Sequence, residues 1–215
     1  MDELSRIAEQ ALQALDARHN AREGALAVSR RLIRHSANTI RAVHRGEFKK
    51  VEKMLDEGRE LVEQFNADLA EEPNIYMAGY VQDALKEFAE ANITYALITG
   101  QPLPGPEELS MDYPAYLKGL GEAMGELRRS ILDLIRGGDL ARGEELLETM
   151  DEVYGVLVTV DYPDAITGGL RRTTDMVRGV LERTRGDLTM AVRQQQLEKT
   201  LRTFEDKVFD EYAPE

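Results

Sequence analysis

Four glutamates near the middle of the chain have the spacing of paired metal ligands. Glu87 and Glu90 lie three residues apart in KEFAEAN, and Glu122 and Glu126 lie four residues apart in GEAMGELRR. Residues at these spacings project from the same side of a helix. Two such pairs on facing helices would surround one point with carboxylate oxygens, the ligands that a hard divalent cation prefers. The pattern indicates a site for a hard divalent cation.

The same spacing also arises without a metal. Glutamate is a strong helix former, and amphipathic helices carry carboxylates on their solvent face. Because the chain has 40 acidic residues, an E-x-x-E pattern is expected by chance. From spacing alone, a solvated helix face remains an alternative to a metal site.

Other catalytic classes find little support in the sequence. The chain has no cysteine, which excludes thiolate chemistry and disulfides. Its histidines, His19, His35 and His44, do not form the Glu-x-x-His motifs of a di-iron bundle. No phosphate-binding glycine motif is present. An all-α nucleotide pyrophosphohydrolase also uses E-x-x-E, but its second helix prefers E-x-x-D where this chain has E-x-x-x-E, so it is the weaker alternative.

A basic segment stands out against the acidic chain. The net charge is −13, yet residues 22–50 hold eight basic and two acidic residues, so this segment is +6 and the remainder −19. Arg30, Arg34, Arg41 and Arg45 fall within roughly 60° on a helical wheel. The planar fork of arginine suits phosphate. These four arginines, the arginine stripe, predict contacts with a phosphate-bearing partner; a solvated or inter-subunit ionic face is the alternative.

The elements that must position these residues are all predicted to be helices. Apolar residues recur with helical period over almost the whole chain, and turn signals interrupt them at Gly46, at the Pro-rich segment 100–106, at Gly137-Gly138-Asp139 and at Gly186-Asp187. The predicted helices are 3–20, 22–46, 48–70, 74–99, 112–136, 139–160, 164–186 and 187–209. No linker divides them, so we expect one all-α domain of antiparallel helices over 1–215.

No apolar run approaches the roughly 20 residues that a membrane span needs. The N-terminal sequence is acidic and has helical period, unlike a secretory signal. We therefore expect a soluble, cytoplasmic protein without membrane contact.

Four segments together resemble the translin family, which includes translin and translin-associated factor X. They are RRLIRHSANTIRAVHRGEF, YVQDALKEFAEANITYALITGQPLP, YLKGLGEAMGELRRSILDLIRGGD and DYPDAITGGLRRTTDMVRGVLERTRGDLT. The chain is similar to the archaeal type of this family. The resemblance implies an all-α bundle of about seven helices that assembles into a hollow homo-oligomer, often an octamer, and binds RNA or single-stranded DNA.

The resemblance also implies roles for the acidic residues. In the factor X branch, an E-x-x-E and an acid on a later helix form a magnesium-dependent endoribonuclease, whereas translin binds without cutting. The E-x-x-E corresponds to Glu87 and Glu90, the later Asp corresponds to Glu122, and the next Glu to Glu126. Glu122 departs from the family's Asp by one methylene and keeps its charge. With acids at all four positions, the chain resembles the catalytic branch more than translin.

Overall fold

The computed structural model describes residues 2–211, and within them the chain forms helices and no strands. This confirms the predicted all-α fold. The predicted domain limits at residues 1 and 215 lie outside the described residues. The helices are α1 (Asp2–His44), α2 (Phe48–Asp68), α3 (Pro73–Tyr76), α4 (Gly79–Thr99), α5 (Tyr113–Gly137), α6 (Leu140–Thr159), α7 (Asp164–Thr167) and α8 (Leu170–Glu211).

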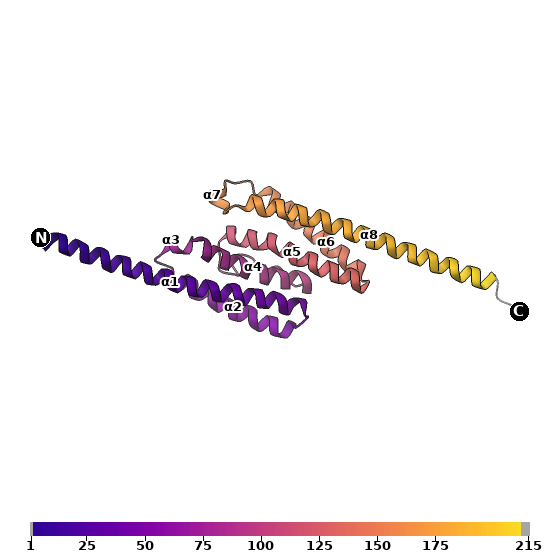
Figure 1. Ribbon diagram of the computed structural model, residues 1–215, viewed down its shortest axis with the longest axis horizontal. Helices are drawn as coiled ribbons and strands as arrows, with labels where there is room; N and C mark the ends of the chain where they lie inside the picture. Colours follow the sequence, from indigo (N-terminus) through magenta and orange to yellow (C-terminus); the bar gives the residue numbers. More distant parts are fainter. Residues whose placement is uncertain (1, 212–215) are drawn as a thin grey trace.

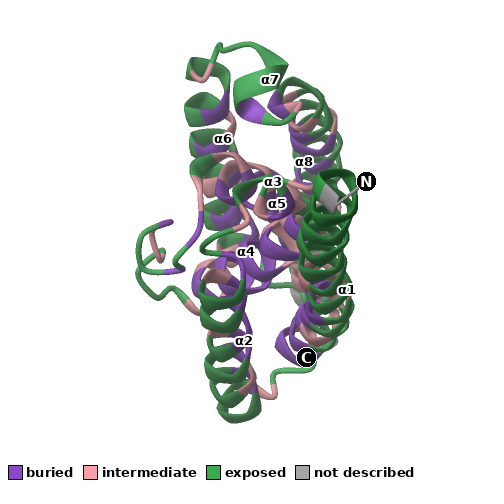
Figure 2. Ribbon diagram, turned by 90° about the vertical axis from the view of Figure 1, so that its left-hand side faces the viewer, coloured by how far each residue is buried: buried purple, intermediate pink, exposed green. Residues whose placement is uncertain are grey.

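Helices α4 and α5 lie side by side at the centre of the bundle (Figure 1). The hairpin of α1 and α2 packs against α4, while α6 and α8 pack against α5. In Figure 2, the buried residues gather on these two central helices. The largest fully buried side chains of α4 and α5 are Leu85, Phe88, Ile93, Met124, Leu127 and Ile131. The central pair therefore supplies a large part of the close-packed core.

The bundle mixes antiparallel and parallel neighbours. The tight turns at Gly46 and Gly138 produce the predicted antiparallel pairs α1/α2 and α5/α6. In contrast, α4 and α5 run parallel, since Lys86 contacts Glu122 near their starts and Ile98 lies by Leu134 near their ends. The Pro-rich segment between them makes this possible, because it carries the chain back to the start of α4.

Two predicted helix breaks are wrong. The segments 3–20 and 22–46 form the single helix α1, and the helix predicted to end at Gly186 continues as α8. Leu188 is fully buried, and Asp187 forms an ion pair with Arg128 of α5 at 2.7 Å. Both contacts require helical backbone through this point. The break lies instead at Gly168-Gly169, where both residues have positive φ angles.

Both long helices extend beyond the bundle, α1 at its N-terminal end and α8 at its C-terminal end, in opposite directions (Figure 1). Residues 3–20 and 193–208 are exposed along these projections. Each projection nevertheless carries large apolar side chains. They are Leu4, Ile7, Leu12 and Leu15 on α1, and Met190, Leu197, Leu201, Phe204 and Val208 on α8. No helix in the described part of the chain combines the length and apolar character that crossing a bilayer requires.

Candidate metal centre

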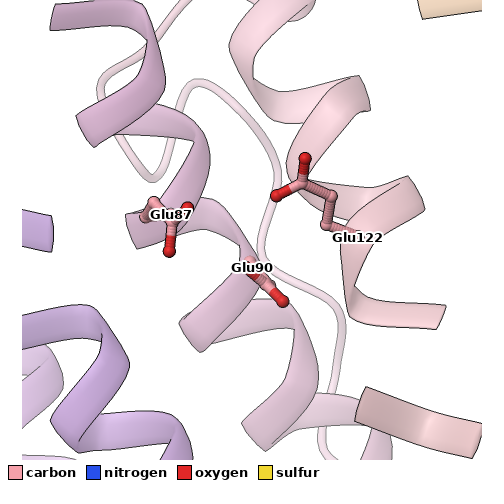
Figure 3. A group of neighbouring side chains, drawn as sticks. All are labelled: Glu87, Glu90 and Glu122. Carbon is pink, nitrogen blue, oxygen red and sulfur yellow. The ribbon is translucent and has the colours of Figure 1, made fainter. Parts of the chain in front are cut away.

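Three of the four predicted glutamates meet between the two central helices. Glu87 and Glu90 on α4 and Glu122 on α5 each offer a carboxylate oxygen, and these oxygens lie within 4.8 Å of one another (Figure 3). We call these three residues the acidic cluster. Glu90 is buried, with 9% of its surface exposed, while Glu87 and Glu122 are partly exposed. The cluster therefore lies at the edge of the core, reachable from solvent.

A glycine lets the two helices approach closely at this cluster. A Cβ atom at Gly119 of α5 would lie 2.7 Å from the Cβ of Ala89 and 2.7 Å from the backbone oxygen of Lys86. No side chain fits at that distance, so glycine is required there. Glu122 follows Gly119 by three residues, on the same side of the helix. The close approach thus brings Glu122 against the turn of α4 that carries Glu87 and Glu90.

Lys86 supplies the cluster with a positive charge. Its Nζ donates to Oε1 of Glu122 at 2.9 Å, lies 2.8 Å from the other carboxylate oxygen of that residue, and lies 3.5 Å from Oε1 of Glu87. Burial lowers the pKa of Lys86, but the hydrogen bond and charge of Glu122 and the charges of Glu87 and Asp83 outweigh it, so the pKa is raised. The sequence prediction missed Lys86, although it is the only basic residue of α4.

Glu90 is the most perturbed acid of the centre. Burial, followed by the charges of Glu87, Glu122 and Glu126, raises its pKa to about 8, and Lys86 opposes this rise. Without a bound cation Glu90 is therefore largely protonated at neutral pH. A perturbed carboxyl beside others of the same charge is a frequent property of functional sites.

Glu126 has a different partner. Its Oε2 accepts a hydrogen bond of 2.5 Å from Nε2 of His44, at the end of α1. The hydrogen bond and charge of His44, with a smaller contribution from Arg129, lower the pKa of Glu126 against the effect of burial. Glu126 is not one of the three converging acids, but its charge reaches Glu90. The sequence prediction did not select His44 as a site residue, because nothing in the local pattern relates it to α5.

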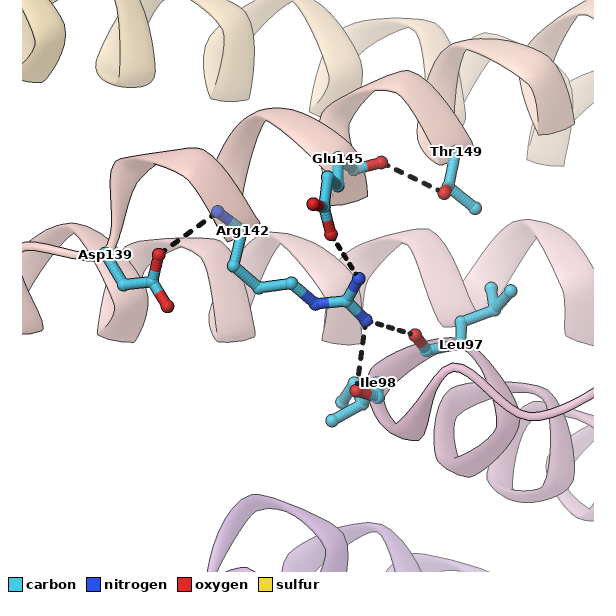
Figure 4. Close-up of polar contacts among 6 residues, drawn as sticks. All are labelled: Leu97, Ile98, Asp139, Arg142, Glu145 and Thr149. Atoms are coloured by element: carbon cyan, nitrogen blue, oxygen red, sulfur yellow. Dashed lines mark hydrogen bonds and ion pairs between the residues drawn. The ribbon is translucent and has the colours of Figure 1, made fainter.

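Other contacts fix the position of α4. Arg142 of α6 donates from Nη2 to the carbonyl oxygens of Leu97 and Ile98 at 3.2 and 3.3 Å, which satisfies the C-terminal end of α4 (Figure 4). Its Nη1 pairs with Glu145 at 2.6 Å.

Thr94 lies one turn beyond Glu90, and its buried hydroxyl has no hydrogen-bond partner among the described residues. A polar atom left unpaired beside the acids suits a hydrated centre.

The donor set fits a hard divalent cation. All three donors are carboxylates, which suit Mg²⁺ or Mn²⁺ rather than a soft metal. Neighbouring ligands of an octahedral magnesium ion lie about 3 Å apart and opposite ligands about 4.2 Å, so the three oxygens, which lie within 4.8 Å of one another, must move closer together to bind one ion. Glu87, Glu90 and Glu122 could therefore hold the ion with small side-chain rotations and a displaced Lys86.

The arginine stripe is exposed along α1. Arg30 and Arg34 form no ion pair with any residue that the structure describes, and Arg41 bonds to the neutral Asn38. Arg45 differs, because its Nε pairs with Glu47 at 2.5 Å. On a helical wheel Arg41 lies about 60° from His44, and His44 faces α5. The C-terminal part of the stripe thus borders the side of α1 that contacts Glu126 of α5 through His44.

Comparisons with known proteins find one similar sequence and several similar structures. No family model matches it. An uncharacterised protein of Methanocaldococcus jannaschii is 31% identical over 204 residues, covering 94% of this chain and 88% of the relative. The structure of an AfC3PO–duplex RNA complex is similar with a TM-score of 0.82 and 33% identity, covering 88% of this chain and 98% of that one. The crystal structure of apo-NeC3PO has a TM-score of 0.76 at 21% identity, with 89% and 98% covered, and supports the fold alone.

The fold and the site define an all-α subunit with a carboxylate cluster between its two central helices. Since AfC3PO is a similar structure over nearly its whole length and exceeds 30% identity, the chain belongs to the translin family, as the sequence resemblance indicated.

Proposed function

We propose that this chain is a divalent-cation-dependent endoribonuclease that works as a homo-oligomer. The observation that carries the proposal is the convergence of Glu87, Glu90 and Glu122 between α4 and α5. Further support is the similarity to AfC3PO, whose structure was solved in complex with duplex RNA. We assign the chain to the catalytic branch of the family because its acids converge.

Each acidic residue has a defined task in this proposal. Glu87, Glu90 and Glu122 hold Mg²⁺ or Mn²⁺, which when bound lowers the pKa of a coordinated water and offsets charge on the scissile phosphate. Glu126, held in one orientation by His44, lies beside them and accepts the proton of the attacking water. Asp83 is exposed and acts only through its charge on Lys86.

The RNA backbone is held by the arginine stripe. Arg30, Arg34 and Arg41 carry no acidic partner among the described residues, so their guanidinium groups are available to phosphate. Contacts of this kind neutralise phosphates without reading bases. We therefore expect salt-dependent binding of RNA, and of single-stranded DNA, with little sequence preference.

The exposed projections support assembly of several copies. On α8, Met190, Gln194, Leu197, Leu201, Phe204 and Val208 follow spacings of four and three residues, as in the seam of a coiled coil. A stripe of this kind is unstable facing water and needs a partner. We propose a homo-oligomer, an octamer as in the family, in which these projections are covered.

An RNA cleavage assay tests the proposal. Labelled single-stranded and structured RNAs are incubated with the full chain and Mg²⁺, Mn²⁺ or a chelator. We expect cleavage that the chelator abolishes and that Glu87→Gln or Glu90→Gln lowers by at least about a hundredfold. Asp133→Asn, which changes an exposed acid of α5 that pairs with Arg136, serves as control and should cleave normally. Equal cleavage by Glu90→Gln and the unmodified chain would rule out this centre.

The second candidate is a non-catalytic protein that binds RNA or single-stranded DNA. It is favoured by Lys86, whose ammonium already neutralises part of the acidic cluster. In that case RNA binds with unchanged affinity in chelator, and no cation promotes cleavage.

A further inference from the structure

Lys86 lies where a cation would compete for the acidic cluster. Its ammonium contacts both carboxylate oxygens of Glu122, at 2.9 and 2.8 Å, and one of Glu87, at 3.5 Å. Only 15% of its side chain is exposed. Among the described residues, no other basic side chain forms an ion pair with Glu87, Glu90 or Glu122. The cluster thus has one internal positive charge, and it comes from the same helix turn as two of the acids.

The chemistry of lysine allows this charge to move. An ammonium is a compact charge with three donors on a flexible four-carbon stem, so it can leave one anion for another nearby without a change in the backbone. The other basic side chains of the region have other partners. His44 is bonded to Glu126 at 2.5 Å, and Arg129 lies 3.9 Å from that same carboxylate.

Glu122 is part of this arrangement. The family resemblance places an aspartate at its position, and the extra methylene of Glu122 lengthens its reach across from α5 to Lys86 on α4. If the Glu122 carboxylate held a divalent cation, Lys86 would lose its main partner. Its ammonium would then be available to a phosphate at the partly exposed edge of the cluster.

We propose that Lys86 is a tethered cation of this centre: it occupies the acidic cluster when no divalent cation is bound, weakens divalent-cation binding by competition, and binds the RNA phosphate once displaced. The inference rests on the proposed function. Lys86 then has two roles whose loss has opposite effects: removing its ammonium strengthens metal binding and slows RNA cleavage. A purely structural role would impair both.

The test measures Mn²⁺ binding and RNA cleavage separately. Binding of Mn²⁺ to the full chain is followed by electron paramagnetic resonance or calorimetry at pH 8, for the unmodified protein, Lys86→Met and Lys86→Gln. Lys53→Met is the control, because Lys53 is an exposed lysine with no ion pair among the described residues. Since a unit charge within about 4 Å of a cation acts strongly even in a polar setting, we expect about tenfold tighter Mn²⁺ binding in both Lys86 variants.

Cleavage at saturating Mn²⁺ should fall about tenfold or more in the same two variants and stay unchanged in Lys53→Met. Equal or weaker Mn²⁺ binding in both Lys86 variants, with melting temperatures near that of the unmodified chain, overturns the inference and leaves the proposed function standing. If Mn²⁺ binds neither the unmodified chain nor the variants, both fail. If Mn²⁺ binds but no RNA is cut, the nuclease proposal fails, and the competing role of Lys86 is decided by the metal affinities alone.

Discussion

His44 donates its Nε2 hydrogen to the carboxylate of Glu126 across 2.5 Å, and this bond joins the end of α1 to the middle of α5. The imidazole is almost fully buried, with 5% of its side chain exposed, while the carboxylate is more accessible. The bond holds the acid next to the cluster in one orientation and keeps it out of the converging group of three.

We expect His44→Ala to destabilise the protein without emptying the centre. Loss of the bond leaves the partly buried Glu126 carboxylate with only Arg129, 3.9 Å away, as a partner. This should lower the free energy of unfolding by about 1–3 kcal/mol, measured by chemical denaturation. Mn²⁺ affinity should change little. A loss of affinity as large as that caused by Glu87→Gln would instead make Glu126 a ligand.

Gly119→Ala tests whether close helix contact forms the centre. The added methyl group would meet Ala89 and the backbone of α4 at 2.7 Å, so α5 must move away. We expect a loss of about 1–3 kcal/mol in stability and weaker Mn²⁺ binding.

Gly125→Ala is the matched control on the same helix, because a Cβ there meets nothing within 4 Å. Alanine is the better helix former, so stability should rise by roughly 0.5–1 kcal/mol, with Mn²⁺ affinity unchanged. Equal behaviour of the two variants would contradict the packing argument.

Glu90 should make metal binding depend on pH. Its pKa is raised to about 8 by burial and by the neighbouring carboxylates, so a bound cation must expel a proton at neutral pH. We expect Mn²⁺ affinity to rise between pH 6 and 8, with proton uptake by the buffer visible in calorimetry. In Glu90→Gln the remaining affinity should be much less dependent on pH; an unchanged pH profile would rule out Glu90 as the source.

The same shift affects stability when no metal is present. Because the folded-state pKa of Glu90 lies above the unfolded value of 4.5, its contribution to stability is fully present below pH 4.5 and is lost as the pH rises through about 8. Unfolding by urea across this range should therefore show a smaller loss of stability in Glu90→Gln than in the unmodified chain.

The arginine stripe should contribute unequally to RNA binding. Arg34 has no ion pair among the described residues, whereas Arg45 must leave Glu47, which it holds at 2.5 Å. We expect Arg34→Ala to weaken binding more than Arg45→Ala, and to reduce the salt dependence of the affinity by about one unit of slope. Arg185→Ala is the control, because Arg185 lies on α8 and pairs with Asp151 of α6. Equal effects of all three would argue against backbone contacts by the stripe.

The projecting end of α8 should control assembly. Leu201→Asp places a charge in the middle of its exposed apolar stripe and should shift the chain toward smaller species in sedimentation or light scattering. The bundle itself should keep its melting behaviour, because Leu201 is exposed there. An unchanged mass would show that the stripe is not an interface.

The sequence predicted three of the helix ends that glycine conformation decides, but not the break at Gly168-Gly169. Gly46, Gly100 and Gly138 all adopt positive φ angles where a stop was expected, because other residues are strained there. The stop at Gly186 was wrong, because its neighbour Leu188 is buried in the core. Tertiary burial, not local propensity, decides that position.

The three converging acids were predicted, but Lys86 beside them and His44 beside Glu126 were not. Helical spacing and the family resemblance were enough to select Glu87, Glu90 and Glu122. The contact of Lys86 with Glu122 depends on the rotation and register of α5 against α4, which Gly119 determines by its missing side chain. The bond between His44 and Glu126 likewise depends on where α1 ends relative to α5. Spacing along one helix carries no information about either.

All members of the acidic cluster and its lysine come from α4 and α5 of a single chain. An assembly of identical subunits would therefore carry one complete centre per copy, with no residue borrowed across an interface. In genetic terms, a defective copy incorporated beside intact ones would subtract only its own share of activity. Mixed assemblies of intact and defective copies should thus lose activity in proportion to the fraction of defective copies.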